Sequence, residues 1–254
     1  MIFLKRILDF YINTSLHVAV AVVSLMLITK LSLNIVIANE LVFFVFFGTV
    51  VGYNFLKYQT AFANGIFRIH KNLSMVAVTL SCLLAMIWSF IQLSLLTQKT
   101  LVTIGILVLI YPKIRRFASL KMTVVSLCVT LVTVFAPTID NDFDGKYFMQ
   151  RFLMVYCLLI PPEICDLTAD SKTIKTLPQI VGVHAIKIIG FVVLTVFFAL
   201  DPTTINLVVG VIVAILIHFS NENRSTYYCS FWVESVPIGW LLMLYTVYVF
   251  NIVQ

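Results

Sequence analysis

Charged residues are scarce in this chain of 254 residues, because Asp, Glu, Lys and Arg together make up only 11% of it, whereas hydrophobic residues make up 61%. Soluble domains carry about 25% charged residues. The shortage excludes a soluble globular protein and leaves no stretch for a separate soluble domain. We therefore expect residues 1–254 to form a single integral membrane domain.

Sequence signals for disulfides, for cysteine metal sites and for a cleaved signal peptide are also missing. The five cysteines have no CxxC or metal-ligand spacing, so no disulfide framework is implied, and most of them lie in apolar runs as small hydrophobic residues. No small-residue cleavage site follows the first apolar run, which predicts a retained helix rather than a signal peptide. We draw no nucleic-acid inference from the net charge of +6, and we expect membrane lipids as partners.

Long apolar runs are what the chain does have. A spanning helix needs about 20 residues, and nine segments reach or approach this length. They lie near residues 15–36, 39–57, 73–94, 98–112, 121–138, 147–163, 178–199, 203–220 and 227–252. The predicted fold is an all-α bundle of about nine transmembrane helices. Because the fourth and fifth segments are short, eight or ten helices remain possible.

The distribution of basic residues predicts the orientation. With an odd number of helices, most of the 17 lysine and arginine residues lie on the side of the membrane that holds the amino terminus. The positive-inside rule places this side in the cytoplasm. We therefore expect a multi-pass protein of the plasma (inner) membrane whose active face is cytoplasmic.

An acidic connection on that side, residues 161–178, reads PPEICDLTADSKTIKTLP. Glu163, Asp166 and Asp170 follow one another at spacings of three and four, which places them along one face of a helix. Neighbouring carboxylates repel one another unless a cation lies among them, and Mg²⁺ prefers a few carboxylates together with phosphate oxygens. An ordinary polar loop with charges at the helix end is the alternative.

A cationic connection lies on the same predicted side, where Tyr111 and Pro112 are followed by Arg115 and Arg116. These cations could serve orientation alone. Alternatively, they could hold an anion directly while a metal ion bridges it to the carboxylates.

The two connections together resemble the UbiA family of intramembrane prenyltransferases. Residues 166–178 are similar to the family's second aspartate-rich motif, DxxxD followed by Lys and a TLP-like stretch, and residues 111–116 are similar to its YPxxKR segment. The resemblance implies a UbiA-like bundle that transfers a prenyl group from a prenyl diphosphate to an aromatic or other lipophilic acceptor, with Mg²⁺ as cofactor.

One departure from the family is large. Its first aspartate-rich motif should end the second helix, but Phe55, Tyr58 and Phe62 stand where aspartates are expected, and only the asparagine remains, as Asn54. We therefore expect one Mg²⁺ site rather than two. Lys57 shares a helix face with Asn54 and Tyr58, and we expect its ammonium group to substitute for the missing ion.

These arguments select a set of site residues. Catalytic roles go to Asp166, Asp170 and Lys57, diphosphate contacts to Asn54, Tyr58, Arg115, Arg116, Lys172 and Lys175, and Mg²⁺ ligation to Asp166, Asp170 and Glu163. Lys187 and Glu234 are further candidates, because ionisable residues inside a span are costly and usually functional. A non-catalytic UbiA-like protein that binds an isoprenoid or a partner is the alternative, and a solute transporter ranks last.

Overall fold

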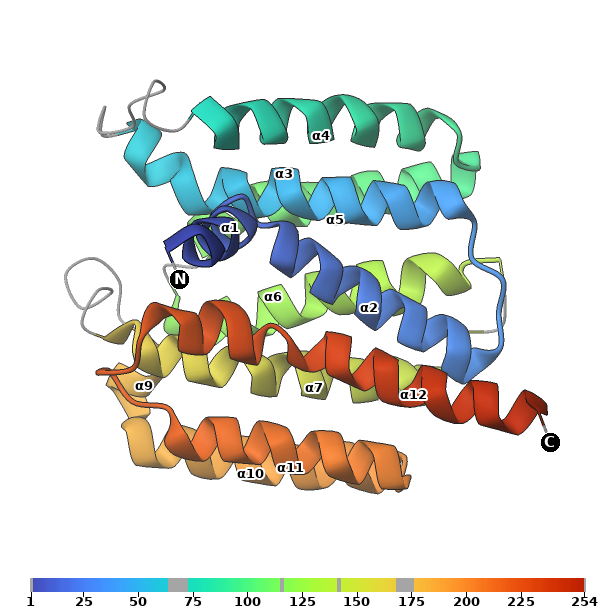
Figure 1. The fold of residues 1–254 in the computed structure, drawn as a ribbon. Coiled ribbons are helices and arrows are strands. Elements are labelled where there is room, and N and C mark those ends of the chain that lie inside the picture. Colours follow the sequence, from blue (N-terminus) through green and yellow to red (C-terminus); the bar gives the residue numbers. More distant parts are fainter. Residues whose placement is uncertain (1, 64–72, 115–116, 141–142, 168–175, 254) are drawn as a thin grey trace.

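The computed structural model describes residues 2–63, 73–114, 117–140, 143–167 and 176–253. All regular structure in these ranges is helical (Figure 1). The α-helices are α1 (Ile2–Asn13), α2 (Leu16–Leu33), α3 (Asn39–Ala63), α4 (Leu73–Ile91), α5 (Leu95–Ile114), α6 (Ala118–Thr130), α7 (Gly145–Cys165), α9 (Leu177–Val181), α10 (Val183–Leu200), α11 (Thr204–Phe219) and α12 (Val236–Val253). The prediction of an all-α protein is confirmed.

Eight helical segments of the described chain are long and apolar enough to cross a membrane, which makes this a multi-pass membrane protein. They correspond one by one to eight of the nine predicted spans. The ninth, predicted at residues 203–220, is α11, which is apolar but has only 16 residues. Figure 1 shows α11 beside α10, returning the chain to the end of the bundle at which the next span begins.

The helix α1 was not predicted. It lies at one end of the bundle, at an angle to the long helices (Figure 1). The turn into α2 is made by Ser15 in the left-handed conformation, with φ of 63°, and Thr14 is held by its hydroxyl, which donates to the carbonyl of Phe10 over 2.7 Å. Both turn residues are buried, so α1 packs against the bundle through this turn.

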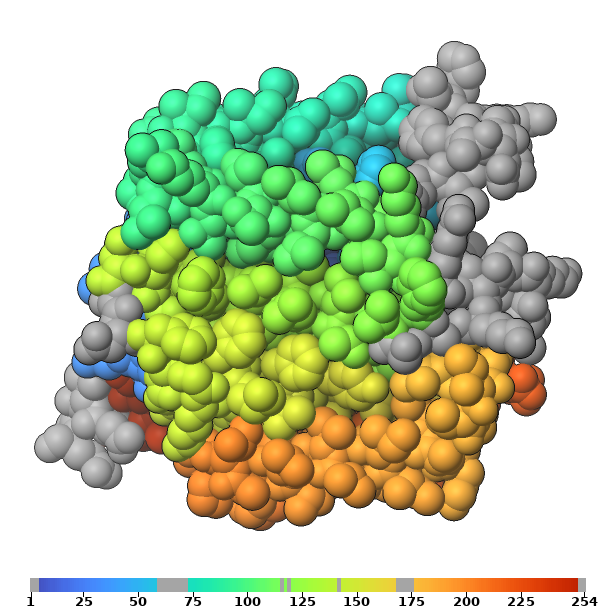
Figure 2. Space-filling view, turned by 180° about the vertical axis from the view of Figure 1, so that it is seen from behind, coloured from blue at the N-terminus to red at the C-terminus, as the bar shows by residue number. Residues whose placement is uncertain are grey.

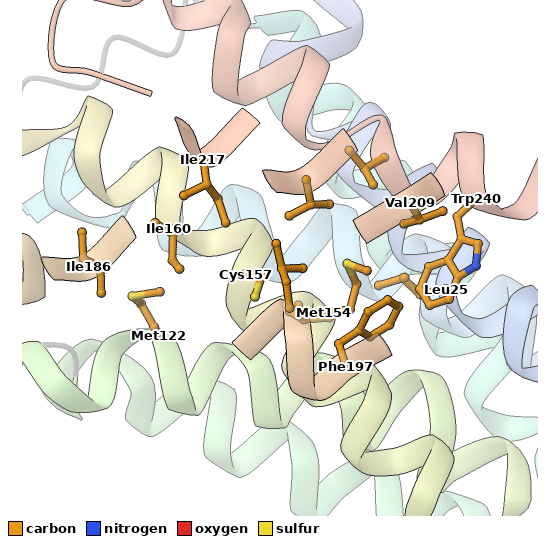
Figure 3. Packing of buried hydrophobic residues seen from close by; sticks show 14 of the residues in the cluster. Leu25, Met122, Met154, Cys157, Ile160, Ile186, Phe197, Val209, Ile217 and Trp240 are labelled. Carbon is orange, nitrogen blue, oxygen red and sulfur yellow. The ribbon is translucent and has the colours of Figure 1, made fainter. Parts of the chain in front are cut away.

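The centre of the hydrophobic core is α7. Its buried side chains Met154, Cys157 and Ile160 face residues of α2, α6, α10, α11 and α12 (Figure 3). The helix α10 comes especially near at Gly190, where a Cβ atom would lie 2.8 Å from Cδ1 of Ile160 and 3.0 Å from Cδ1 of Ile217. Small residues at such crossings let membrane helices approach closely.

The outer surface is apolar where it would meet lipid. Leu84, Trp88 and Leu109, for example, expose 71%, 60% and 66% of their surface. Figure 2 shows one face of the bundle, on which the green, yellow and orange parts of the chain lie in successive layers. Water would disfavour such a surface, whereas the hydrocarbon core of a bilayer accepts it.

Three predicted spans are interrupted. The segment predicted at 121–138 continues from α6 into a π-helix, η2 (Leu131–Phe135), and a short 3-10 helix, η3 (Ala136–Thr138). The segment at 178–199 is divided into α9 and α10 by Gly182, whose φ is 88°. The segment at 227–252 begins with a second π-helix, η4 (Tyr228–Val233), before α12. Such π turns inside helices are frequent at functional sites.

Candidate functional site

Several predicted site residues lie at one end of the bundle. The helices α3, α5 and α7 finish there and η4 begins there, as Figure 1 shows. Lys57 and Tyr58 belong to the last turns of α3, and Asp166 caps the end of α7. Segments that are far apart in the sequence therefore deliver polar groups to the same region.

The hydrogen bond between Tyr53 and Glu234 is the centre of this region. The Tyr53 hydroxyl donates to Oε1 of Glu234 over 3.3 Å, which links α3 to the residue that follows η4. Glu234 also lies within electrostatic range of the Lys57 ammonium group, and Asp166 and Tyr111 lie within electrostatic range of Tyr53. We call these five residues the Tyr53 cluster. It combines two carboxylates, one ammonium group and two phenols at the end of a membrane bundle.

The position of Glu234 depends on η4. Its backbone N–H donates to the carbonyl of Cys229, five residues earlier, over 3.3 Å, which is the hydrogen-bond pattern of a π turn. His17 of α2 supports this turn, because its Nε2 lies 3.1 Å from the carbonyl of Phe231 and 3.2 Å from Oγ of Ser235. The imidazole also stacks on the Phe231 ring, with 5.1 Å between the ring centroids. The contacts of His17 therefore hold the turn that presents Glu234.

Asn54 is buried and makes three hydrogen bonds within the protein. Its Oδ1 accepts from the Ser15 hydroxyl over 2.6 Å, and its Nδ2 donates to the carbonyl of Thr14 over 3.2 Å and to the Thr79 hydroxyl over 2.9 Å. These bonds join the turn between α1 and α2 to both α3 and α4. They give Asn54 a structural role, and its predicted contact with diphosphate stays a prediction.

Lys57 and Tyr58 follow on the same helix. The Tyr58 hydroxyl donates to the carbonyl of Asn13 over 3.1 Å, so this side chain also contacts the end of α1. The Lys57 side chain is exposed, and its Nζ lies 5.4 Å from the centroid of the Tyr58 ring, within the range of a cation–π contact. Lys57 therefore lies near both Tyr58 and Glu234.

Glu163, a predicted metal ligand, is buried and forms an ion pair with α6, because its Oε1 lies 2.7 Å from Nζ of Lys121. Asp166, one helical turn further on, is exposed at the end of α7, where its backbone N–H donates to the carbonyl of Pro162 over 2.9 Å. Within the described ranges, no three His, Cys, Asp or Glu side chains are grouped so as to hold a metal ion.

Five predicted site residues lie outside the described residues: Asp170, Arg115, Arg116, Lys172 and Lys175. Their roles and the Mg²⁺ site therefore stay predictions. The two flanks of the acidic segment are described, and Gln179 links them. Its Oε1 accepts from the backbone N–H of Thr176 over 3.0 Å, and its Nε2 donates to the carbonyl of Leu167 over 3.2 Å.

The other intramembrane candidate, Lys187, has a different role. Its ammonium group donates to the carbonyls of His218 and Ser220, each over 2.8 Å. These carbonyls lie at the carboxyl end of α11, where helical partners are absent and a cation is favourable. Lys187 therefore links α10 to the end of α11 by hydrogen bonds and is not part of the Tyr53 cluster.

Comparisons of the chain with protein-family models, with curated proteins and with solved structures found no match. The resemblance to UbiA prenyltransferases therefore stays an expectation from the sequence.

Proposed function

We propose that this chain is a divergent UbiA-like prenyltransferase that binds a prenyl diphosphate at the Tyr53 cluster. The observation that supports this proposal is the convergence of Lys57, Asp166 and Glu234 at one end of the bundle. Lys57 stands at the place where the family has its first motif, of which only Asn54 remains, and Asp166 stands in the segment similar to the second. The amino terminus and this end of the bundle would face the cytoplasm.

In the proposed reaction, the bond between the allylic carbon and the diphosphate oxygen breaks, and negative charge builds on the leaving group. In this proposal Lys57 would meet this charge as a cation at the end of the bundle. Arg115, Arg116, Lys172 and Lys175 would contact the phosphate oxygens. A single Mg²⁺, held by Asp166 and Asp170, would supply further positive charge to the diphosphate. Glu163 is the weaker ligand candidate because it is paired with Lys121.

The lipophilic acceptor would attack the allylic carbon and lose a proton. In this proposal Glu234 would receive the proton, and the hydroxyl of Tyr53 donates a hydrogen bond to one of its oxygens. The faces of Tyr53 and Tyr111 could also stabilise the allylic cation while it exists. The membrane would deliver both the prenyl tail and the acceptor from the same hydrocarbon phase.

Binding of a prenyl diphosphate to the purified protein in lipid nanodiscs, with and without Mg²⁺, tests this function. Diphosphate release in the presence of candidate aromatic acceptors should be measured alongside it. Asp166→Asn should weaken Mg²⁺-dependent binding, whereas Asp144→Asn, at the opposite end of the same helix, should not. Likewise Lys57→Met should weaken binding and Lys99→Met should not. If all four variants bind like the parent, the proposed site is wrong.

A second function is favoured by one set of contacts. Asn54 and Glu163 use their polar atoms inside the protein, and the first-motif carboxylates are missing. A protein that kept the UbiA-like scaffold and only binds an isoprenoid or a partner would have this arrangement. In the same assay, tight binding of the prenyl ligand without any diphosphate release would select this function.

A further inference from the structure

Two cysteine side chains meet beside the Tyr53 cluster. Cys165 is the last residue of α7, and Cys229 is the second residue of η4. The Cys229 thiol donates to Sγ of Cys165, and the two sulfur atoms are only 3.1 Å apart. This is shorter than an ordinary van der Waals contact between sulfur atoms, although both thiols are free. Because a disulfide is about 2.05 Å long, the sulfur atoms need to approach by only about 1 Å to become bonded.

We propose that Cys165 and Cys229 are a redox modification site at which a reversible disulfide links α7 to η4. The oxidant is a low-molecular-weight disulfide. One protein thiolate attacks it and releases the first small thiol, and the second protein thiolate then attacks the mixed disulfide and releases the second. Two protein S–H bonds and one small-molecule S–S bond are lost, and one protein S–S bond and two small-molecule S–H bonds are formed.

The surroundings of the pair favour this exchange. Both side chains are partly exposed, so a small reagent can reach them. The remaining cysteines, Cys82, Cys128 and Cys157, are free thiols on α4, α6 and α7.

The disulfide would join two parts of the Tyr53 cluster. Cys165 directly precedes Asp166, and the carbonyl of Cys229 accepts the backbone hydrogen bond of Glu234 over 3.3 Å. The cross-link would therefore fix the end of α7 relative to the turn that carries Glu234. We expect the oxidised protein to bind prenyl diphosphate more weakly, because the two carboxylates could no longer adjust around the ligand. This consequence rests on the proposed function, whereas the disulfide itself does not.

Thiol counting tests the bond directly. The full-length protein in nanodiscs is reduced, treated with oxidised glutathione, denatured and labelled with a maleimide, and its mass is measured. The number of free thiols should fall by two from the five of the sequence, and dithiothreitol should restore them. A cross-linked peptide pair containing Cys165 and Cys229 should appear after digestion. Cys128→Ser should also lose two thiols, whereas Cys165→Ser and Cys229→Ser should form no internal cross-link.

Three results would overturn the proposal: five free thiols after treatment, a cross-link to another cysteine, or an internal cross-link that persists in Cys165→Ser. The effect on the site is measured separately, by comparing prenyl diphosphate binding before and after oxidation. Equal binding by both forms would refute the predicted effect on the site while the bond stands. Absence of binding in both forms would contradict the proposed function and leave the thiol count to decide on the disulfide.

Discussion

The ion pair between Lys121 and Glu163 gives a prediction that separates a structural carboxylate from a metal ligand. The side chain of Glu163 is 8% exposed and that of Lys121 is 20% exposed, with 2.7 Å between the charged atoms. At this distance, and with an effective dielectric constant of about 20, the gross attraction is about 6 kcal/mol. Desolvation of both groups offsets most of this attraction. The loss of stability when one partner is removed is therefore more informative than the attraction energy of the pair.

The two partners should respond unequally. Lys121→Met leaves the more deeply buried charge of Glu163 without its ammonium group, and we expect unfolding to become easier by about 3 kcal/mol, at the low end for buried pairs. Glu163→Gln leaves Lys121, which reaches solvent more readily, and should cost about 1 kcal/mol. The double variant should lose about 2 kcal/mol less than the sum of the two single losses.

Equilibrium unfolding in mixed micelles measures these three values, and additive losses would refute an energetic role for the pair. Prenyl diphosphate binding at fixed Mg²⁺ supplies the second measurement. If Glu163 is structural only, both single variants should bind the ligand like the parent per folded molecule. Weaker Mg²⁺-dependent binding by Glu163→Gln alone would instead identify Glu163 as a metal ligand.

Three further predictions concern packing, hydrogen bonding and pH. Gly190→Ala should be less stable than Gly210→Ala by about 1–2 kcal/mol in the same unfolding assay. Both variants gain helix propensity, but only the new methyl group at position 190 meets two isoleucine side chains. Equal stabilities would contradict the close approach of α10 to its neighbours. Asn54→Ala should cost about 2 kcal/mol through its lost buried hydrogen bonds and should speed amide exchange in the turn between α1 and α2; exchange at the parent rate would argue against this role. The hydrogen bond from Tyr227 to Asp9 raises the pKa of the Tyr227 phenol above its ordinary value of 10.0, so the contact stabilises α1 fully below that pH and is lost as the pH rises through the raised pKa. Tyr227→Phe should abolish this alkaline loosening of α1, measured by amide exchange, and loosening that persists in the variant would point to another group.

The long helices were predictable because their signal is composition summed over many residues. Any segment of about 20 apolar residues is forced to be helical in a membrane, since its backbone groups have no other partners. The helix α1 escaped this rule because Lys5, Arg6 and Asp9 interrupt its apolar residues. It is held instead by tertiary hydrogen bonds, such as those made by Asn54 and Tyr58, which composition does not reveal.

The site was predictable only in part, for a different reason. Asp166 could be selected from a motif with a fixed local spacing, and Lys57 from the helix face that it shares with Asn54 and Tyr58, and their roles stay predictions. Tyr53 had no such signal, because its partner Glu234 lies 181 residues away in the sequence. Glu234 was noticed only as a costly charge inside a span, and the same reasoning selected Lys187, which instead binds the end of α11. Hydropathy cannot distinguish the role of Glu234 from that of Lys187, because each role depends on which hydroxyl or carbonyl group the fold brings near the charged side chain.

The π-helix η4 explains how an apolar span can present a carboxylate to Tyr53 at the end of the bundle. One extra residue in a turn rotates everything after it by about 100°, since an α-helix has 3.6 residues per turn. Trp232 is 61% exposed on the outer surface, whereas Glu234 reaches Tyr53 and Trp240 is buried against Phe197. Both inward contacts lie after the π turn, so the turn sets the face that α12 directs into the core. A continuous α-helix, as the apolar run alone predicts, would rotate Glu234 and Trp240 together away from these partners. The π turn is therefore part of the candidate site, although none of its own side chains belongs to the Tyr53 cluster.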